Sequence, residues 1–158
     1  MNLDTFCIPD EIYAISPSEG VIVTGTKIPR YSSLFEYHFP DFPVLPGIYL
    51  IEFIAQSAGH LTMASSGFTK MAVLAKVSHC KFSNFVSPGE KIVCKIEKHK
   101  SEHGFTLSAA TVSCGERIVC SAEIRMKIMD FPSERARDLL VSNFEILYPK
   151  AMVEDMAM

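Results

Sequence analysis

The sequence has no excess of basic residues, no CxxC pair and no basic, apolar leader. Its 158 residues include 15 Lys and Arg against 18 Asp and Glu, which gives a net charge of −3. Without a basic excess to neutralise phosphates, we expect no nucleic-acid partner. The odd number of cysteines, five, predicts free thiols in a reducing compartment, and hence a cytoplasmic protein. The first residues, MNLDTFCIPDE, lack the basic n-region of a secretory signal peptide.

Metal-ligand spacing and internal repeats are missing as well. No histidine stands at metal-ligand spacing from other ligands, so we expect no metal and no cofactor. His60 is interpreted as a satisfied core or interface histidine, and His79, His99 and His103 as strand or turn residues. With 48% apolar and 21% charged residues and no linker, the chain is predicted to form one globular domain with a sizeable core.

Hydrophobic periodicity and turn residues predict two strands, one long helix, further strands and a last helix. The strands are expected over residues 11–16, 20–29, 71–77, 81–86, 91–100, 105–113 and 117–129. The helices are expected over 47–64 and 132–148, the latter with Ser133 as N-cap, and residues 31–37 as a loop or short turn. Residues 1–10 should form a partly ordered lead-in, and the tail AMVEDMAM should fray. This order predicts an α+β fold, in which a curled antiparallel sheet wraps around one central helix.

The most unusual stretch runs from His38 to Gln56. Its first part, HFPDFPVLPG, holds three prolines, which stiffen the backbone and exclude a helix. The part after Gly47 is apolar on nearly every face, which predicts an enclosed helix that is too short and too polar to span a membrane. It carries Glu52 and Gln56 one turn apart, and buried polar groups are costly unless they are paired or used. We therefore interpret His38 and Glu52 as a candidate acid/base pair; the alternatives are a structural loop histidine and a carboxylate paired with an arginine.

The motif and the order of elements together resemble the (3R)-hydroxyacyl-acyl carrier protein dehydratases of fatty-acid synthesis, which have the hot-dog fold. The resemblance covers roughly residues 10–128. Its residues are His38-Phe39-Pro40, the Pro46-Gly47 helix start, Glu52 fourteen positions beyond His38, and Gln56 with Ala58-Gly59. A weaker second match is Lys81-Phe82 followed by Phe85-Val86-Ser87-Pro88-Gly89-Glu90. Residues 1–131 would be the hot-dog domain, and residues 132–158 a C-terminal helical extension of it.

The resemblance implies dehydration of a 3-hydroxyacyl group carried by acyl carrier protein. His38 and Glu52 would be the catalytic pair, the Gly47 amide would polarise the thioester carbonyl, and Gln56 would support Glu52. Histidine suits removal of the C2 proton because its pKa lies near neutrality. A carboxyl on an apolar helix would have its pKa raised by desolvation, so it can hold the second proton. The first amides of a helix are unpaired and suit a developing negative charge.

The family also implies an assembly. A homodimer would join two sheets and place the site between protomers, with His38 of one chain facing Glu52 of the other. Dimers can assemble into hexamers, and a hetero-oligomer with a related dehydratase is a second option. The cations Lys76, Lys81 and Arg30 are candidate contacts for an acidic carrier protein.

The chain departs from the family at two positions beside the histidine and at its N-terminal side. Asp41 replaces the glycine of the family's HFPG, and Tyr37 stands where a glycine often precedes the histidine. CIPDEIYAIS replaces the usual HRxPFLLVDRV. These differences predict a specialised member, acting in a secondary-metabolite or polyene pathway. A non-catalytic acyl-binding or partner subunit and a thioesterase on the same fold stay open, although the spacing of His38 and Glu52 favours the dehydratase.

Overall fold

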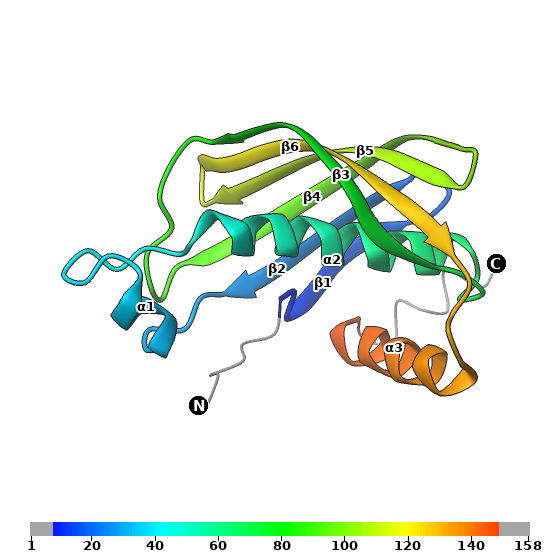
Figure 1. The fold of residues 1–158 in the computed structure, drawn as a ribbon, viewed down its shortest axis with the longest axis horizontal. Helices are drawn as coiled ribbons and strands as arrows, with labels where there is room; N and C mark the ends of the chain where they lie inside the picture. Colours follow the sequence, from blue (N-terminus) through cyan, green and yellow to red (C-terminus); the bar gives the residue numbers. More distant parts are fainter. Residues whose placement is uncertain (1–7, 149–158) are drawn as a thin grey trace.

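The computed structural model describes residues 8–148, and the expectations for residues 1–7 and for the tail lie outside the described residues. In chain order the elements are β1 (Glu11–Ser16), β2 (Val21–Lys27), α1 (Ser33–Tyr37), α2 (Gly47–Ser65), β3 (Met71–Phe82), β4 (Lys91–Glu102), β5 (Phe105–Cys114), β6 (Arg117–Met129) and α3 (Glu134–Leu147). Figure 1 shows a curled sheet with α2 lying along it and α3 set against one end. The predicted α+β fold, including the C-terminal helix, is confirmed.

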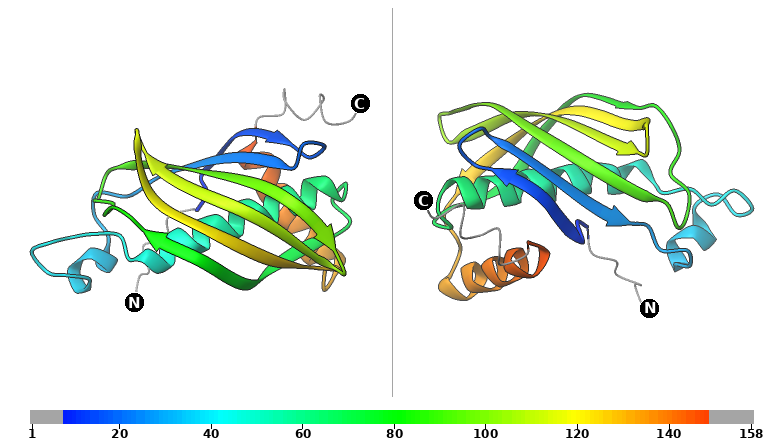
Figure 2. Two further views of the ribbon diagram at one scale, coloured as in Figure 1. Left: turned by 90° about the horizontal axis from the view of Figure 1, so that it is seen from above. Right: turned by 180° about the vertical axis from the view of Figure 1, so that it is seen from behind.

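Six strands form one antiparallel sheet in the order β1-β2-β4-β5-β6-β3, so β1 and β3 are its edge strands. The alternation along β4 decides which face turns inward: Ile92, Cys94 and Ile96 are buried, whereas Lys95 and Glu97 are exposed. Neighbouring strands are twisted relative to one another, and the sheet therefore curls over α2 (Figure 2).

The core lies between the concave face of the sheet and α2. Phe53 and Ile54 of α2 are completely buried there. A small residue on the same helix also allows close contact with β2: the Ser57 hydroxyl lies 2.7 Å from the hydroxyl of Thr24 and donates to the Phe53 carbonyl at 2.7 Å. Both hydroxyls are therefore satisfied inside the core, where an unpaired polar group would be destabilising.

The segment before the proline-rich loop differs from its prediction. Residues 31–37 contain the five-residue helix α1 rather than only a loop or turn. Ser32 is its N-cap and accepts a hydrogen bond from the Leu34 amide at 3.3 Å. Phe35 fixes this helix to the protein by burying its ring. The short helix forms because capping and one buried aromatic ring compensate for its small number of internal hydrogen bonds.

The prediction of separate strands over 71–77 and 81–86 is wrong, because β3 is one strand of twelve residues that ends at Phe82. It carries two register shifts against β6, one of them between Ser78 and Lys81. His79 within that bulge has a φ of +49°. Bulges interrupt the two-residue periodicity on which the sequence prediction depends, so one strand resembled two.

The C-terminal helix begins as predicted. The Ser133 hydroxyl accepts a hydrogen bond from the Ala136 amide at 3.1 Å, and the ring of Phe144 is buried. The four described cysteines are free thiols, as predicted. None of the helices between residues 8 and 148 has the length and apolar character needed to cross a membrane.

Candidate active site

His38 is fixed at both ends of the proline-rich loop. Its backbone amide closes α1 by donating to the Leu34 carbonyl at 3.2 Å. Its ring atom Nδ1 lies 3.0 Å from the Val44 carbonyl oxygen on the far side of the loop. A carbonyl can only accept, so this contact places the proton on Nδ1 and leaves the Nε2 lone pair available as a base.

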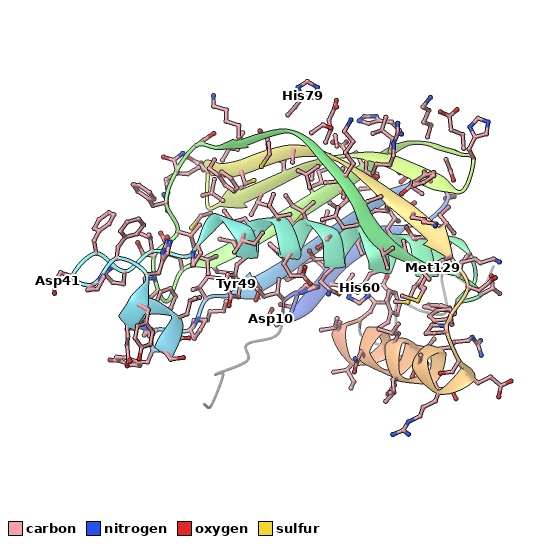
Figure 3. All side chains as sticks on the ribbon, in the orientation of Figure 1. Asp10, Asp41, Tyr49, His60, His79 and Met129 are labelled. Atoms are coloured by element: carbon pink, nitrogen blue, oxygen red, sulfur yellow. The ribbon has the colours of Figure 1, made fainter. Side chains whose placement is uncertain are left out.

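The loop between these two contacts has an uncommon backbone. Phe39 and Asp41 have φ values of +56° and +67°, in the left-handed region, and the Phe42 amide donates to the Phe39 carbonyl at 2.9 Å. Aspartate tolerates the left-handed region better than most residues other than glycine. The family glycine that Asp41 replaces would therefore occupy a position whose conformation favours glycine. The loop tip that carries Asp41 projects from the molecule in Figure 3.

The second family-like segment, residues 81–90, contacts the proline-rich loop that follows His38. The sequence did not reveal this contact. The Leu45 amide donates to the Val86 carbonyl at 2.8 Å. The rings of Phe42 and Phe85 pack edge to face with centroids 5.5 Å apart. The two short motifs, 43 positions apart from His38 to Lys81, are therefore parts of one structure, and their joint presence is the signal for this in the sequence.

Gly47 begins α2 and lies under the ring of Phe82. A Cβ atom at Gly47 would lie 2.9 Å from Cε1 of Phe82, closer than side chains pack. Pro46 is the N-cap and provides no side-chain hydrogen bond. The Tyr49 amide donates to the Pro46 carbonyl at 3.0 Å, and the Gly47 amide lies at the positive end of the helix dipole, where the oxyanion prediction requires a donor.

Glu52 and Gln56 lie one turn apart on α2, and Gln56 Nε2 donates to Glu52 Oε1 at 2.7 Å. Both side chains are exposed in a single chain, as is Ile48 one turn earlier. Ile48, Glu52 and Gln56 therefore form an exposed stripe on α2. Along this stripe, the prediction that the helix is enclosed is wrong for a single chain. Within residues 8–148 of one chain, His38 and Glu52 are not brought into contact: the His38 ring bonds the Val44 carbonyl, and Glu52 accepts from Gln56.

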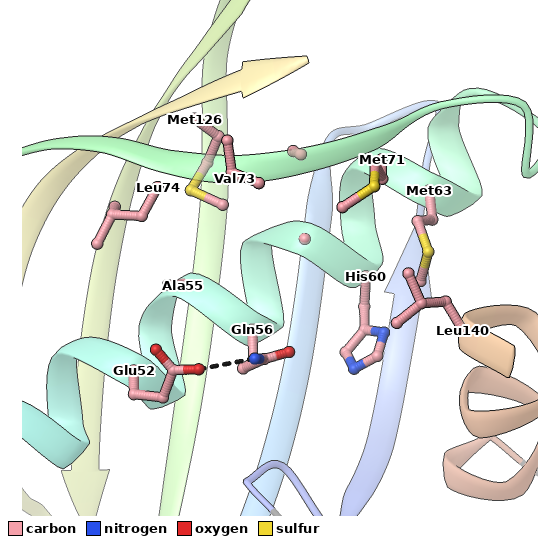
Figure 4. A pocket seen from close by; sticks show the side chains of 12 residues that line it. Glu52, Ala55, Gln56, His60, Met63, Met71, Val73, Leu74, Met126 and Leu140 are labelled. Carbon is pink, nitrogen blue, oxygen red and sulfur yellow. Dashed lines mark hydrogen bonds between the residues drawn. The ribbon is translucent and has the colours of Figure 1, made fainter. Parts of the chain in front are cut away.

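A cavity of about 280 Å³ opens beside this stripe, between α2 and β3. Figure 4 shows Glu52 and Gln56 toward one end of it and His60 and Met63 toward the other. Most of its lining is apolar: Ala55, Gly59, Met63, Met71, Ala72, Val73, Leu74, Met126 and Leu140. The arrangement places the predicted acid beside a space suited to an apolar chain.

The remaining histidines lie in the predicted kinds of position, but the prediction of a satisfied His60 is wrong, because its Nδ1 atom is buried without a hydrogen-bond partner among the described residues. His60 is only 7% exposed, and its ring centroid is 5.7 Å from that of Phe144. Burial lowers the pKa of His60 from 6.5 to about 4, so its imidazole is neutral at neutral pH. His79, His99 and His103 are exposed strand or turn residues. Within residues 8–148, no three His, Cys, Asp or Glu side chains gather closely enough to hold a metal ion.

Residues 14–122 match the model of the ApeI-like family, which is described as ApeI dehydratase. The chain belongs to the ApeI-like dehydratase family. It is also similar to two curated proteins named 3-hydroxyacyl-[acyl-carrier-protein] dehydratase FabZ. With that of Protochlamydia amoebophila it shares 31% identity over 126 residues, 79% of this chain and 81% of that protein. With that of Listeria welshimeri it shares 30% identity over 129 residues, 80% of this chain and 88% of that protein.

The fold of this ApeI-like dehydratase is also similar to that of solved structures. The dehydratase heterocomplex ApeI:P from Xenorhabdus doucetiae aligns with a TM-score of 0.62 at 13% identity, covering 85% of this chain and 89% of that one. A hypothetical thioesterase with coenzyme A from Streptococcus pneumoniae TIGR4 aligns with a TM-score of 0.61 at 22% identity, covering 78% and 88%. With the curled sheet around α2, these likenesses confirm the predicted hot-dog fold.

Proposed function

We propose that this chain is a 3-hydroxyacyl-acyl carrier protein dehydratase, which converts a (3R)-3-hydroxyacyl thioester to the trans-2-enoyl thioester and water. The observation that carries the proposal is the orientation of His38, whose Nδ1 is occupied by the Val44 carbonyl and whose Nε2 is left as a base. The ApeI dehydratase family match and the FabZ-named relatives support the same reaction class.

The proposed mechanism uses two side chains and one amide. His38 Nε2 takes a proton from C2, and the electron pair moves toward the thioester carbonyl, whose oxygen accepts a hydrogen bond from the Gly47 amide. The C3–O bond then breaks, and the hydroxyl leaves as water with a proton from the carboxyl of Glu52. Gln56 holds that carboxyl by its 2.7 Å hydrogen bond. The proton on His38 afterwards returns to Glu52, so the protein is regenerated.

We propose a homodimer in which the partner covers the exposed stripe of α2. Two observations support it. The edge strand β3 is twelve residues long and exposes Val73 and Leu74, and such an edge is prone to pair with another strand. The predicted acid Glu52 is exposed and contacts no base among residues 8–148 of its own chain. A partner's His38 would supply that base and remove the carboxyl from water.

A hetero-oligomer with a related dehydratase is the second possibility for the assembly. The name of one structural neighbour, the ApeI:P heterocomplex, describes that protein as part of such a complex. The carrier protein is proposed to approach through Arg30, Lys76 and Lys81, all of which are exposed. The cytoplasm is the proposed compartment, supported by the four free cysteines of the described chain.

The test is dehydration of 3-hydroxyacyl-acyl carrier protein by the purified full chain, followed by mass spectrometry of the acyl group. His38→Ala and Glu52→Gln should each lower the rate by roughly 10²-fold or more, the usual contribution of a positioned acid or base. His99→Ala, at an exposed histidine on β4, is the matched control and should keep full activity. Absence of turnover at several chain lengths, or full turnover in both site variants, would disprove the proposal.

A thioesterase is the other candidate, because one aligned structure is named a hypothetical thioesterase bound to coenzyme A. Its product would be a free thiol, which a thiol reagent reports in the same reactions. Thiol release without an enoyl product would favour it. A non-catalytic partner subunit would instead show no activity alone and would copurify with a second hot-dog protein.

A further inference from the structure

The cavity beside α2 has a defined far end. Glu52 and Met63, which both line it, are eleven residues apart, or about 16 Å along the helix axis. Met71 of β3 and Leu140 of α3 also line the cavity, and Figure 4 shows both beside Met63, away from Glu52. Among the described residues of α3, Leu140 is the one that lines the cavity. A chain entering beside Glu52 and following the helix would therefore reach α3.

The position of α3 against this end is fixed by several contacts. The ring of Phe144 is 1% exposed and packs between His60 and Phe68, with ring centroids 5.7 Å and 5.1 Å away. Arg137 Nε donates to the Phe68 carbonyl at 2.8 Å. Leu140 lies one turn from both Arg137 and Phe144, on the same face of α3. Its side chain is thereby held at the cavity end.

We propose that α3 forms the end wall of the acyl cavity and that Leu140 limits the length of the acyl chain. The inference rests on the proposed dehydratase function and adds the feature that selects the substrate. α3 lies beyond residues 14–122, the part that matches the family model. The wall is therefore supplied by a segment outside the residues that the family model matches.

The polarity of the wall fits an uncharged chain end. Met63, Met71 and Leu140 are apolar, and the polar lining residue beside them is His60. His60 is buried against Phe144 and stays neutral near pH 7. The cavity end therefore carries no full charge that would favour a carboxylate- or ammonium-ended chain. The ligand class is an apolar acyl chain whose length the wall sets.

The experiment compares kcat/KM of the full-length protein for 3-hydroxybutyryl, 3-hydroxyoctanoyl and 3-hydroxydodecanoyl thioesters of acyl carrier protein. Leu140→Ala should raise the ratio of long-chain to short-chain kcat/KM on the order of tenfold, because small changes in an apolar pocket discriminate by that much. Leu140→Trp should lower the same ratio by a similar factor. Leu139→Ala is the matched control on the same helix, since Leu139 is exposed and absent from the cavity lining, and should leave the ratio unchanged.

Two results would overturn the inference: an unchanged ratio in both Leu140 variants, or an equal shift in Leu139→Ala. Leu140→Met, of similar volume, provides a second test if Leu140→Ala does not fold, and it should keep the wild-type ratio while Leu140→Trp shifts it. If the wild type shows no turnover, the proposed function fails. Calorimetric binding of saturated acyl-pantetheines of the same lengths then tests the wall alone, with the same expected order among the variants.

Discussion

At the scale of single residues, α2 contains two glycines whose surroundings differ. A methyl group at Gly47 would lie 2.9 Å from Cε1 of Phe82, whereas one at Gly59 would meet nothing closer than the Ala72 carbonyl oxygen at 4.0 Å. Phe82 is 52% exposed, so its ring can move aside. Gly47→Ala should therefore change the free energy of unfolding by no more than about 1 kcal/mol, yet reduce dehydration at least tenfold, since methyl and ring would crowd the amide.

Gly59→Ala is the stability control for this prediction. It should raise the free energy of unfolding by about 0.5–1 kcal/mol, the difference in helix propensity between the two residues. Denaturant midpoints report both stabilities, and the dehydration assay reports the activity of Gly47→Ala. Full turnover by a folded Gly47→Ala protein would show that the Gly47 amide lies away from the reacting carbonyl.

The residues of the site could be read from the sequence, but their conformations could not. The motif predicts His38, Gly47, Glu52 and Gln56 as site residues from their characteristic spacings. Asp41 was recognised only as a departure from a family glycine; the φ of +67° that explains a glycine there depends on how the whole loop is closed. One closing contact, between the Leu45 amide and the Val86 carbonyl, joins segments far apart in sequence, and no local pattern encodes it.

At the scale of elements, the predicted bounds agree with the structure where local sequence signals mark the ends of an element. α2 is expected over 47–64 and is observed at Gly47–Ser65, because a glycine after proline begins it and Ser66-Gly67 follows it. β3 was divided in two because its bulges break the alternation. The exposed stripe of α2 was missed for another reason: an apolar composition shows that a helix is buried in some assembly, but not that one chain buries it.

The contact between α2 and α3 should respond to pH through His60. Its pKa is about 4 in the folded protein, lowered by burial, against 6.5 as the ordinary value. Between these pH values the unfolded chain binds the extra proton, so stability is full above pH 6.5 and is lost as the pH falls toward 4. From this residue alone, the free energy of unfolding should fall by about 2 kcal/mol between pH 7 and pH 5.

Comparison of His60→Leu with the wild type isolates this contribution. The leucine variant should lose less stability between pH 7 and pH 5 than the wild type, measured by denaturant unfolding at both pH values. His99→Gln, at an exposed histidine, should keep the wild-type dependence. Equal slopes in the wild type and His60→Leu would mean that the buried imidazole is not the group that titrates.

At the scale of the whole molecule, the proposed site is incomplete within residues 8–148 of one chain. The carboxyl of Glu52 lies on the exposed stripe of α2, and the proposed base His38 is held in its own loop. The sheet order leaves β3 at an edge, with Val73 and Leu74 exposed beside this stripe's cavity. Strand order is a property of the completed sheet, so sequence periodicity could not show which strand would be the open edge.

Subunit mixing distinguishes a shared site from one contained in a single chain. His38→Ala and Glu52→Gln proteins should each be inactive. When the two are unfolded together and refolded, half of the dimers would be mixed, and each mixed dimer would hold one intact site out of two. A two-fold dimer should therefore recover about a quarter of wild-type activity. His38→Ala refolded with itself is the control and should stay inactive. No recovery in the mixture, with dimers verified by sedimentation, would place both groups in one chain and would require the loop of His38 to move toward its own α2.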